Sequence, residues 1–161
     1  MISLSELIWA VFVLFIAAIT LIDARTYRIP NVILLVLAAF GLAAILLLTP
    51  STVLTHLVAA LVTLGVGYLL YTTTGFGAGD AKFFAVILLW FGAAGVIPLL
   101  FWFGLSCAVL VVLLAIGRRL PLANTKLGAW RPLQKGAPVP LALAIGPAAI
   151  IASTQISNGL W

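Results

Sequence analysis

Residues 81–117 read AKFFAVILLWFGAAGVIPLLFWFGLSCAVLVVLLAIG and contain one charged side chain, that of Lys82. A single helix over this stretch would be about 55 Å long at about 1.5 Å per residue, whereas the hydrocarbon core of a bilayer is about 30 Å thick. Two glycines and a proline in residues 92–98 favour a turn near its middle. The stretch therefore predicts two membrane-spanning helices joined by a tight turn.

The rest of the chain has the same apolar character. Of its 161 residues, 65% are hydrophobic and 7% are charged, whereas about 25% of the residues of a soluble domain are charged. Apolar runs and helix-breaking residues together predict an all-α, polytopic transmembrane helix bundle that forms a single domain over residues 1–161. The six expected helices cover residues 4–22, 31–48, 52–72, 80–93, 96–117 and 139–157.

Positive charges predict the orientation of this bundle, because Lys and Arg in short loops stay on the cytoplasmic side of a membrane. All eight Lys and Arg residues of the chain lie in or beside the loops that follow the first, third and fifth expected helices. We therefore expect these loops in the cytoplasm, both chain termini outside, and a multi-pass protein of the bacterial cytoplasmic (inner) membrane. The eight residues are Arg25, Arg28, Lys82, Arg118, Arg119, Lys126, Arg131 and Lys135.

The same placement argues against a nucleic-acid-binding protein, although the formal net charge is +5. Cys107 is the one cysteine and His56 the one histidine, so we expect no disulfide within the chain, no metal site and no cofactor. We expect His56 near the membrane interface. Four tryptophans are expected at helix ends or facing lipid, where indole rings commonly lie: Trp9, Trp90, Trp102 and Trp161.

Asp23 and Asp80 are the only aspartates, and ionisable groups in or near a membrane are costly enough to indicate a function. The predicted topology places Asp23 at the end of the first helix and Asp80 at the start of the fourth, both on the cytoplasmic side. Two carboxyl groups held close together share a proton, which suits aspartyl proteolysis: one activates water and the other polarises the scissile carbonyl. The alternative is that each aspartate pairs with a basic residue or caps a helix, as Asp80 would at an N-cap.

Glycines alternate before Asp80, where residues 75–80 read GFGAGD. Because glycine has no Cβ, this pattern leaves room for a substrate backbone beside the carboxylate and permits dihedrals closed to other residues. Gly75 and Gly79 also have the spacing of small residues that pack helices together. After Asp23, Pro30 keeps the connection to the second helix short.

Three segments carry a family resemblance. Asp23 is followed by RIPN at residues 28–31, residues 77–82 read GAGDAK, and residues 139–146 read VPLALAIG. In order and in expected topology, they resemble the first-aspartate motif, the second-aspartate motif and the last span of the type IV prepilin peptidases, which are membrane aspartyl proteases of the GxGD kind. The resemblance covers essentially the whole chain.

This resemblance implies cleavage of the basic leader from prepilins or pseudopilins at the cytoplasmic face, typically after a glycine, which leaves the apolar helix of the pilin in the membrane. Asp23 and Asp80 would be the catalytic pair, and Gly77 and Gly79 would shape the loop. The implied partners are these substrates, the lipid bilayer and the pilus-assembly machinery, with no nucleic acid. The remaining motif residues, whose roles stay unassigned, are Lys82, Arg28, Pro30, Asn31 and Pro140.

The segment from Asp23 to Asn31 is short and has no cysteine. Larger relatives carry a cytoplasmic insertion with paired cysteines there and also methylate the mature pilin, so we expect a peptidase without methyltransferase activity. The chain looks most similar to the minimal peptidases that accompany Flp-type, tight-adherence pili. It departs from many relatives after Pro140, where it has Leu141 and Ala142 in place of an aromatic residue and glycine.

Two other functions remain open at this point. An ion- or proton-coupled transporter also uses intramembrane carboxylates, although usually near the midplane and in repeated halves. A non-catalytic scaffold of the pilus machinery would need neither acid. The basic segment at residues 118–137 suits anionic lipid headgroups, with screening of substrates as the alternative.

Overall fold

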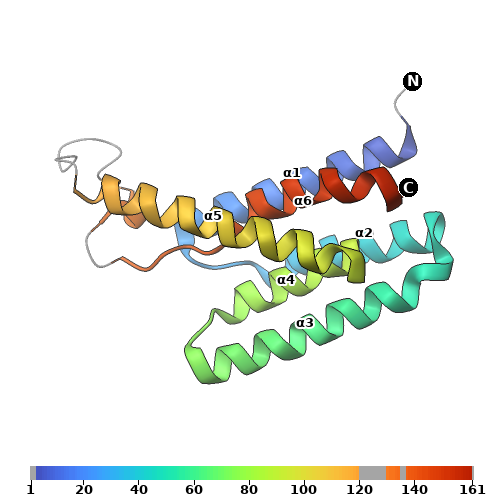
Figure 1. Ribbon diagram of the computed structural model, residues 1–161, viewed down its shortest axis with the longest axis horizontal. Coiled ribbons are helices and arrows are strands. Elements are labelled where there is room, and N and C mark those ends of the chain that lie inside the picture. The colour runs from blue at the N-terminus through green and yellow to red at the C-terminus, as the bar shows by residue number, and fades with distance from the viewer. Residues whose placement is uncertain (1–2, 120–129, 135–136, 161) are drawn as a thin grey trace.

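The computed structural model describes residues 3–119, 130–134 and 137–160, which form helices and the segments that join them (Figure 1). The predicted all-α bundle is confirmed. In this part of the chain the α-helices are α1 (Leu4–Thr26), α2 (Asn31–Leu48), α3 (Val53–Thr74), α4 (Ala78–Phe91), α5 (Val96–Gly117) and α6 (Ala142–Leu160). Short 3-10 turns are η1 (Pro50–Thr52), η2 (Ala93–Gly95) and η3 (Arg131–Leu133).

Four of these helices are long and apolar enough to cross a membrane on their own: α1, α2, α3 with its preceding turn, and α5 with its preceding turn. All six predicted helices are present. Four of them meet the length and hydropathy requirements for a membrane span. Helix α4 has 14 residues. At about 1.5 Å per residue it extends for about 21 Å, less than the hydrocarbon core of about 30 Å.

Two helix boundaries beside the aspartates differ from the prediction. Helix α1 continues to Thr26, past the predicted end at residue 22, so Asp23 lies in its last turn. Helix α4 begins at Ala78, with Gly77 as its N-cap, so the alternative in which Asp80 is the N-cap is wrong. Asp80 lies instead in the first turn of α4, where the partial positive charge of a helix N-terminus favours a carboxylate.

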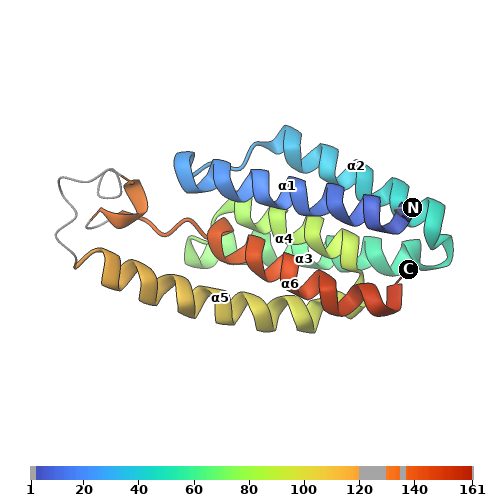
Figure 2. The same cartoon turned by 90° about the horizontal axis from the view of Figure 1, so that it is seen from above.

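The bundle has two distinct ends. The C-terminal ends of α1, α3 and α5 and the N-terminal ends of α2, α4 and α6 lie together, on the left in Figures 1 and 2. The start of α1 and the end of α6 lie at the opposite end. The described basic residues all belong to the first end, which we call the basic end: Arg25, Arg28, Lys82, Arg118, Arg119 and Arg131. That this end faces the cytoplasm stays a prediction.

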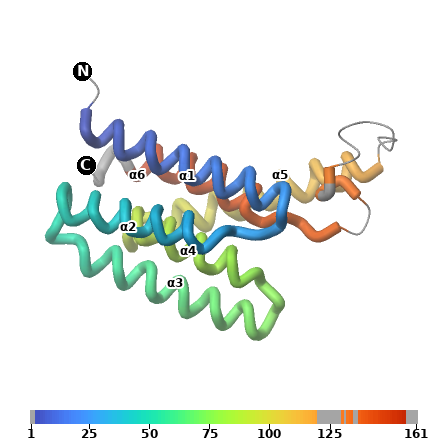
Figure 3. The backbone as a smooth tube through the Cα atoms, turned by 180° about the vertical axis from the view of Figure 1, so that it is seen from behind, coloured from blue at the N-terminus to red at the C-terminus, as the bar shows by residue number. Residues whose placement is uncertain are grey.

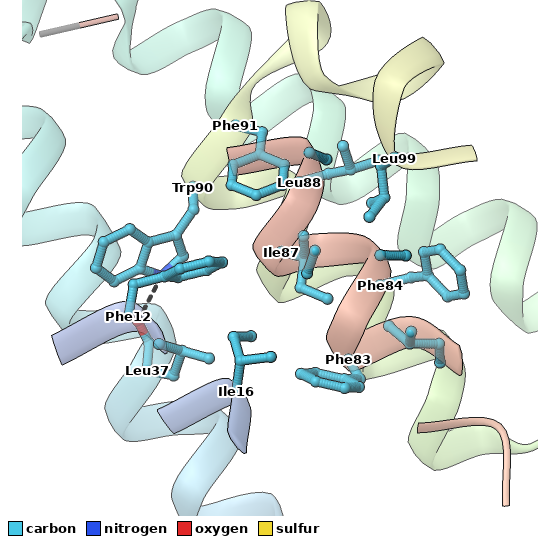
Figure 4. Close-up of a cluster of buried hydrophobic side chains, with 14 of the residues drawn as sticks. Phe12, Ile16, Leu37, Phe83, Phe84, Ile87, Leu88, Trp90, Phe91 and Leu99 are labelled. Atoms are coloured by element: carbon cyan, nitrogen blue, oxygen red, sulfur yellow. Dashed lines mark hydrogen bonds between the residues drawn. The ribbon is translucent and has the colours of Figure 1, made fainter. Parts of the chain in front are cut away.

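Helix α4 is the centre of the bundle and packs against α2, α3 and α6 (Figure 3). Its core-facing side chains, such as Phe83 and Ile87, belong to one apolar cluster that also contains Phe12 of α1 and Leu37 of α2 (Figure 4). Trp90 belongs to this cluster: it is 4% exposed, and its Nε1 donates a hydrogen bond of 3.0 Å to the carbonyl oxygen of Leu37. The prediction that Trp90 lies at the interface or faces lipid is therefore wrong.

His56 is buried by protein, a feature that its expected place near the membrane interface does not specify. Its Nδ1 donates a hydrogen bond of 2.8 Å to the carbonyl oxygen of Leu89, one of the last carbonyls of α4. Gly92, which follows α4 with a φ of 63°, lies against the same imidazole. The His56 imidazole therefore satisfies a carbonyl group near the C-terminus of α4. This contact lies at the end of the bundle opposite the aspartates.

Candidate active site

Two segments far apart in sequence line one pocket of about 380 Å³ at the basic end of the bundle. The first segment runs from the end of α1 to the start of α2, and the second is the start of α4. The pocket, which we call the aspartate pocket, is lined by Asp23, Tyr27, Arg28, Ile29, Asn31, Gly77, Ala78, Gly79, Asp80 and Lys82.

Asp23 is held by the end of α1. Tyr27 caps this helix in the left-handed conformation, with φ 54°, and its backbone N–H donates to the Asp23 carbonyl oxygen at 2.8 Å. A left-handed non-glycine residue costs about 1 kcal/mol, so the packing around Tyr27 must maintain the turn. The turn at Tyr27 ends α1 within one helical turn of Asp23, and the chain then continues to α2.

Asp23 is 6% exposed. Its Oδ2 is buried without a hydrogen-bond partner among the described residues. A backbone hydrogen bond from Ala142, the first residue of α6, also reaches this carboxyl group. The unsatisfied oxygen is costly unless a second group, such as water or a substrate, occupies the pocket. The start of α6 thus contributes to the site through its backbone.

Asp80 depends on two glycines for its position. A Cβ atom on Gly77 would collide with Oδ2 of Asp80, so a side chain at residue 77 would displace the carboxyl group. Gly67 of α3 lets the next residue, Ala81, approach closely, because a Cβ there would lie 2.6 Å from the Ala81 Cβ. By contrast, a Cβ on Gly79 would make an ordinary contact of 3.5 Å with Ile29.

The Asp23 carboxylate acts electrostatically on Asp80. Asp80 lies outside the four candidate spans, and its burial, together with the Asp23 carboxylate, raises its pKa to about 7. A carboxyl group with this pKa is partly protonated near neutral pH, as a general acid must be. The Asp23 carboxylate thus contributes to the raised pKa of Asp80, and catalysis by the two acids as a pair stays a prediction.

Lys82 and Asn31 join the two segments of the pocket. Lys82 Nζ donates a hydrogen bond of 3.0 Å to Asn31 Oδ1, which connects α4 to the first residue of α2. Lys82 follows Asp80 by two residues in α4, and Asn31 begins the helix that follows the Asp23 loop. The bond therefore links the two aspartate-bearing segments across the edge of the pocket.

The motif residues have distinct places. Five of them line the aspartate pocket with the two acids: Arg28, Asn31, Gly77, Gly79 and Lys82. Pro30 is the N-cap of α2. Pro140 is buried before α6 and does not line this pocket. The unusual dihedral expected from the glycines occurs only at Gly75, with φ 76°, since Gly77 has φ −64°.

Three contributions were missed by the sequence analysis. Tyr27 has a left-handed conformation that glycine or asparagine would usually signal, and the Ala142 backbone has no residue-type signal. Trp130 donates through Nε1 to the carbonyl oxygen of Ala24 at 3.2 Å, directly beside Asp23. No local pattern marks this contact, because it joins residues 106 positions apart.

Trp130 belongs to the segment 118–137, for which we favoured lipid contact. The described part of this segment also bonds to itself: Arg118 donates to the carbonyl oxygens of Pro132 at 3.0 Å and of Ala137 at 2.7 Å. Residues 120–129 and 135–136 lie outside the described residues, and with them Lys126 and Lys135. Lipid contact by this segment stays a prediction.

Comparison with known proteins identifies the family. A scan against protein-family models matches residues 10–114 to the type IV leader peptidase family. Searches of curated proteins and of solved structures find no match. The matched range contains Asp23, Asp80 and the whole lining of the aspartate pocket, whereas Pro140 lies beyond it. Because the match covers well over half of the sequence, the chain belongs to the type IV leader peptidase family.

Proposed function

We propose that this protein is a membrane aspartyl endopeptidase that removes the basic leader from prepilins or pseudopilins at the cytoplasmic face. The main support is the aspartate pocket, where Asp23 and Asp80 come together within the range matched by the peptidase family. The basic end of the bundle carries this pocket, and basic loops are typical of the cytoplasmic side. A cytoplasmic site would meet a basic leader on the side of the membrane where basic segments stay.

The proposed mechanism uses the aspartate pair as general acid and base. We assign the ionised role to Asp23, whose carboxylate accepts a hydrogen bond from the Ala142 N–H at the start of α6. It takes a proton from water as the water attacks the scissile carbonyl. Asp80 is the protonated member, which polarises that carbonyl and then protonates the leaving amine. This assignment agrees with the pKa of Asp80, which burial and Asp23 raise to about 7.

Glycine at residue 77 has a specific place in this mechanism. It gives the Asp80 carboxyl group room to fold back over the start of α4, where a Cβ would collide with it. A methyl group on Gly79 would fit among the neighbouring side chains, so we infer that the absence of a side chain there serves the approach of a substrate backbone.

We also propose that the protein cleaves the leader without methylating the mature pilin.

The test co-expresses the protein with a prepilin and follows removal of the leader by gel mobility. Asp23→Asn and Asp80→Asn each remove one member of the pair, so each variant should cleave at least about 100-fold more slowly. Glu6→Gln is the matched control, because Glu6 is the remaining acidic residue and caps the start of α1 at the other end of the bundle. Membrane insertion of every variant is verified by fractionation.

Cleavage that survives either aspartate substitution would overturn the assignment of the pair. Pilus assembly that persists in the Asp23→Asn, Asp80→Asn double variant would instead support a non-catalytic scaffold. Ion flux that both substitutions abolish, with leader removal unchanged, would favour a transporter. The three functions therefore give different results with the same two substitutions.

A further inference from the structure

A second hollow adjoins the aspartate pocket. It has a volume of about 510 Å³ and lies between α2, α3 and α4. Asn31 and Lys82 line both this hollow and the aspartate pocket, so their hydrogen bond of 3.0 Å marks the junction between the two. Beyond these two residues the lining is apolar, formed by leucine, alanine and valine side chains. We call this hollow the apolar groove.

The apolar groove is formed by helix faces that run away from the aspartates. Its lining on α2 includes Asn31, Leu35 and Ala38, and its lining on α4 includes Lys82, Val86 and Leu89. These spacings of three or four residues place each set on one face of its helix. From the junction to Ala38 or Leu89 the groove extends for about 10 Å, about two helical turns.

The groove stays open because of how α2 and α3 pack. Both helices pack against α4, whereas they make few contacts with each other. Leu35 of α2 and Leu61 of α3, which line the groove, are 69% and 67% exposed. Both helices are candidate membrane spans, so the groove opens toward the membrane while its polar end meets the aspartate pocket.

We propose that the apolar groove binds the apolar helix that follows the scissile bond in the substrate. This inference rests on the proposed function. A chain that leaves the aspartate pair toward the membrane reaches the Asn31–Lys82 junction first and the apolar faces of α2 and α4 next. The start of a membrane-embedded helix would therefore meet an apolar surface of matching character within its first two turns.

Another apolar hollow lacks the feature for which we assign a protein helix, rather than lipid, to the apolar groove. This other hollow has a volume of about 620 Å³ and lies along α3, α4 and the start of α5, with Val62 and Leu100 in its lining. It shares no lining residue with the aspartate pocket. The two hollows are thus similar in volume and in their apolar lining. Of the two, only the apolar groove continues into the aspartate pocket.

We expect the protein to recognise the substrate segment that follows the scissile bond by its shape and hydrophobicity. The probe is a single-span reporter with a lysine-rich leader, a glycine at the junction and an apolar helix of about 20 residues. A second probe, a short junction peptide, has the same leader and glycine but lacks the apolar helix.

The first experiment measures contact without catalysis. A photoreactive amino acid replaces Leu61 in the apolar groove or Val62 in the other hollow, both in the Asp80→Asn background. These two residues are neighbours on α3 with similar exposure, 67% and 60%. We expect crosslinks to the reporter from residue 61 at least about tenfold above those from residue 62. Equal yields, or crosslinks to lipid alone at residue 61, would overturn the proposal.

The second experiment fills the groove. Ala38→Phe places a ring between the helix faces, whereas Ala39→Phe, on the exposed neighbouring position of α2, is the matched control. The preference for the reporter over the short peptide, as a ratio of kcat/KM, should fall about tenfold in Ala38→Phe through a higher KM for the reporter. It should stay constant in Ala39→Phe. An equal loss on both substrates in Ala38→Phe would contradict the proposal.

The two experiments also separate this inference from the proposed function. Crosslinks at residue 61 together with no cleavage by the wild-type protein would mean that the groove binds the helix but that the peptidase assignment is wrong. Cleavage by the wild type without selective crosslinks would leave the peptidase assignment intact and reject the groove as the binding site.

Discussion

Helices α4 and α5 are both strongly apolar, yet they occupy opposite environments. Nine of the 14 residues of α4 are buried, whereas two of the 22 residues of α5 are. Helix α4 lies among α2, α3 and α6, and α5 packs mainly along α6 and leaves most of its surface toward the membrane. The difference shows that position in the bundle, rather than hydrophobicity, decides which apolar helix can hold a desolvated acid such as Asp80.

The largest expected effect compares one tryptophan from each helix. Trp90 of α4 fills the core and donates to Leu37, so Trp90→Ala should lower the free energy of unfolding by about 3–5 kcal/mol. Trp102 of α5 is partly exposed and donates to Gln155, so Trp102→Ala should cost about 1 kcal/mol. Chemical denaturation in detergent micelles measures both. Equal losses would mean that α4 is no more central than α5.

The next effect depends on pH. The pKa of Asp80 is about 7 in the folded protein, against an ordinary value of 3.8. Between these values the folded state binds more protons than the unfolded state, so the contribution of Asp80 to stability decreases as pH rises through 7. Asp80→Asn should therefore stabilise the protein increasingly with pH, with a gain on the order of 2 kcal/mol between pH 5 and pH 8.

Unfolding of wild type and Asp80→Asn at the two pH values measures this gain. Glu6→Gln is the control, since Glu6 is exposed at the start of α1 and stays charged in both states over this range. A constant difference between wild type and Asp80→Asn would show that Asp80 is charged in the folded protein throughout.

A smaller effect compares two glycines. Gly67→Ala introduces a Cβ 2.6 Å from that of Ala81, so α3 and α4 must separate, at a cost of about 1 kcal/mol. Because Ala81 adjoins Asp80, leader cleavage should also slow. Gly104 of α5 has nothing within 4 Å of an added Cβ, so Gly104→Ala should be neutral or stabilise by less than about 1 kcal/mol. Slower cleavage in Gly104→Ala would contradict this comparison.

The smallest effect is expected on the membrane-facing surface of α5. Leu113 is 60% exposed, so Leu113→Ala should change the free energy of unfolding by less than about 0.5 kcal/mol. The same denaturation assay in micelles measures it. A loss comparable to that of Trp90→Ala would show that this face of α5 is covered by protein, for example in an oligomer.

The sequence predicts the helices well and their ends less well. Apolar runs locate all six helices, and α2 and α5 have the bounds that were predicted. The errors at α1 and α4 arise from the caps: Tyr27 adopts a conformation that its type does not signal, and Gly77 caps α4 before the first charged residue. Cap geometry depends on a few local contacts that hydropathy does not report.

The sequence by itself also determines which residues can carry the chemistry, because a chain with two aspartates offers few alternatives. Only the tertiary structure decides that these aspartates share a pocket and that the Ala142 backbone bonds to Asp23. It also decides that Trp130 donates a hydrogen bond to the carbonyl oxygen of Ala24, beside Asp23. It also decides that Trp90 and His56 are buried in protein. The physical reason is that lipid and protein interior are both apolar, so sequence hydrophobicity cannot distinguish them, whereas packing between distant segments does.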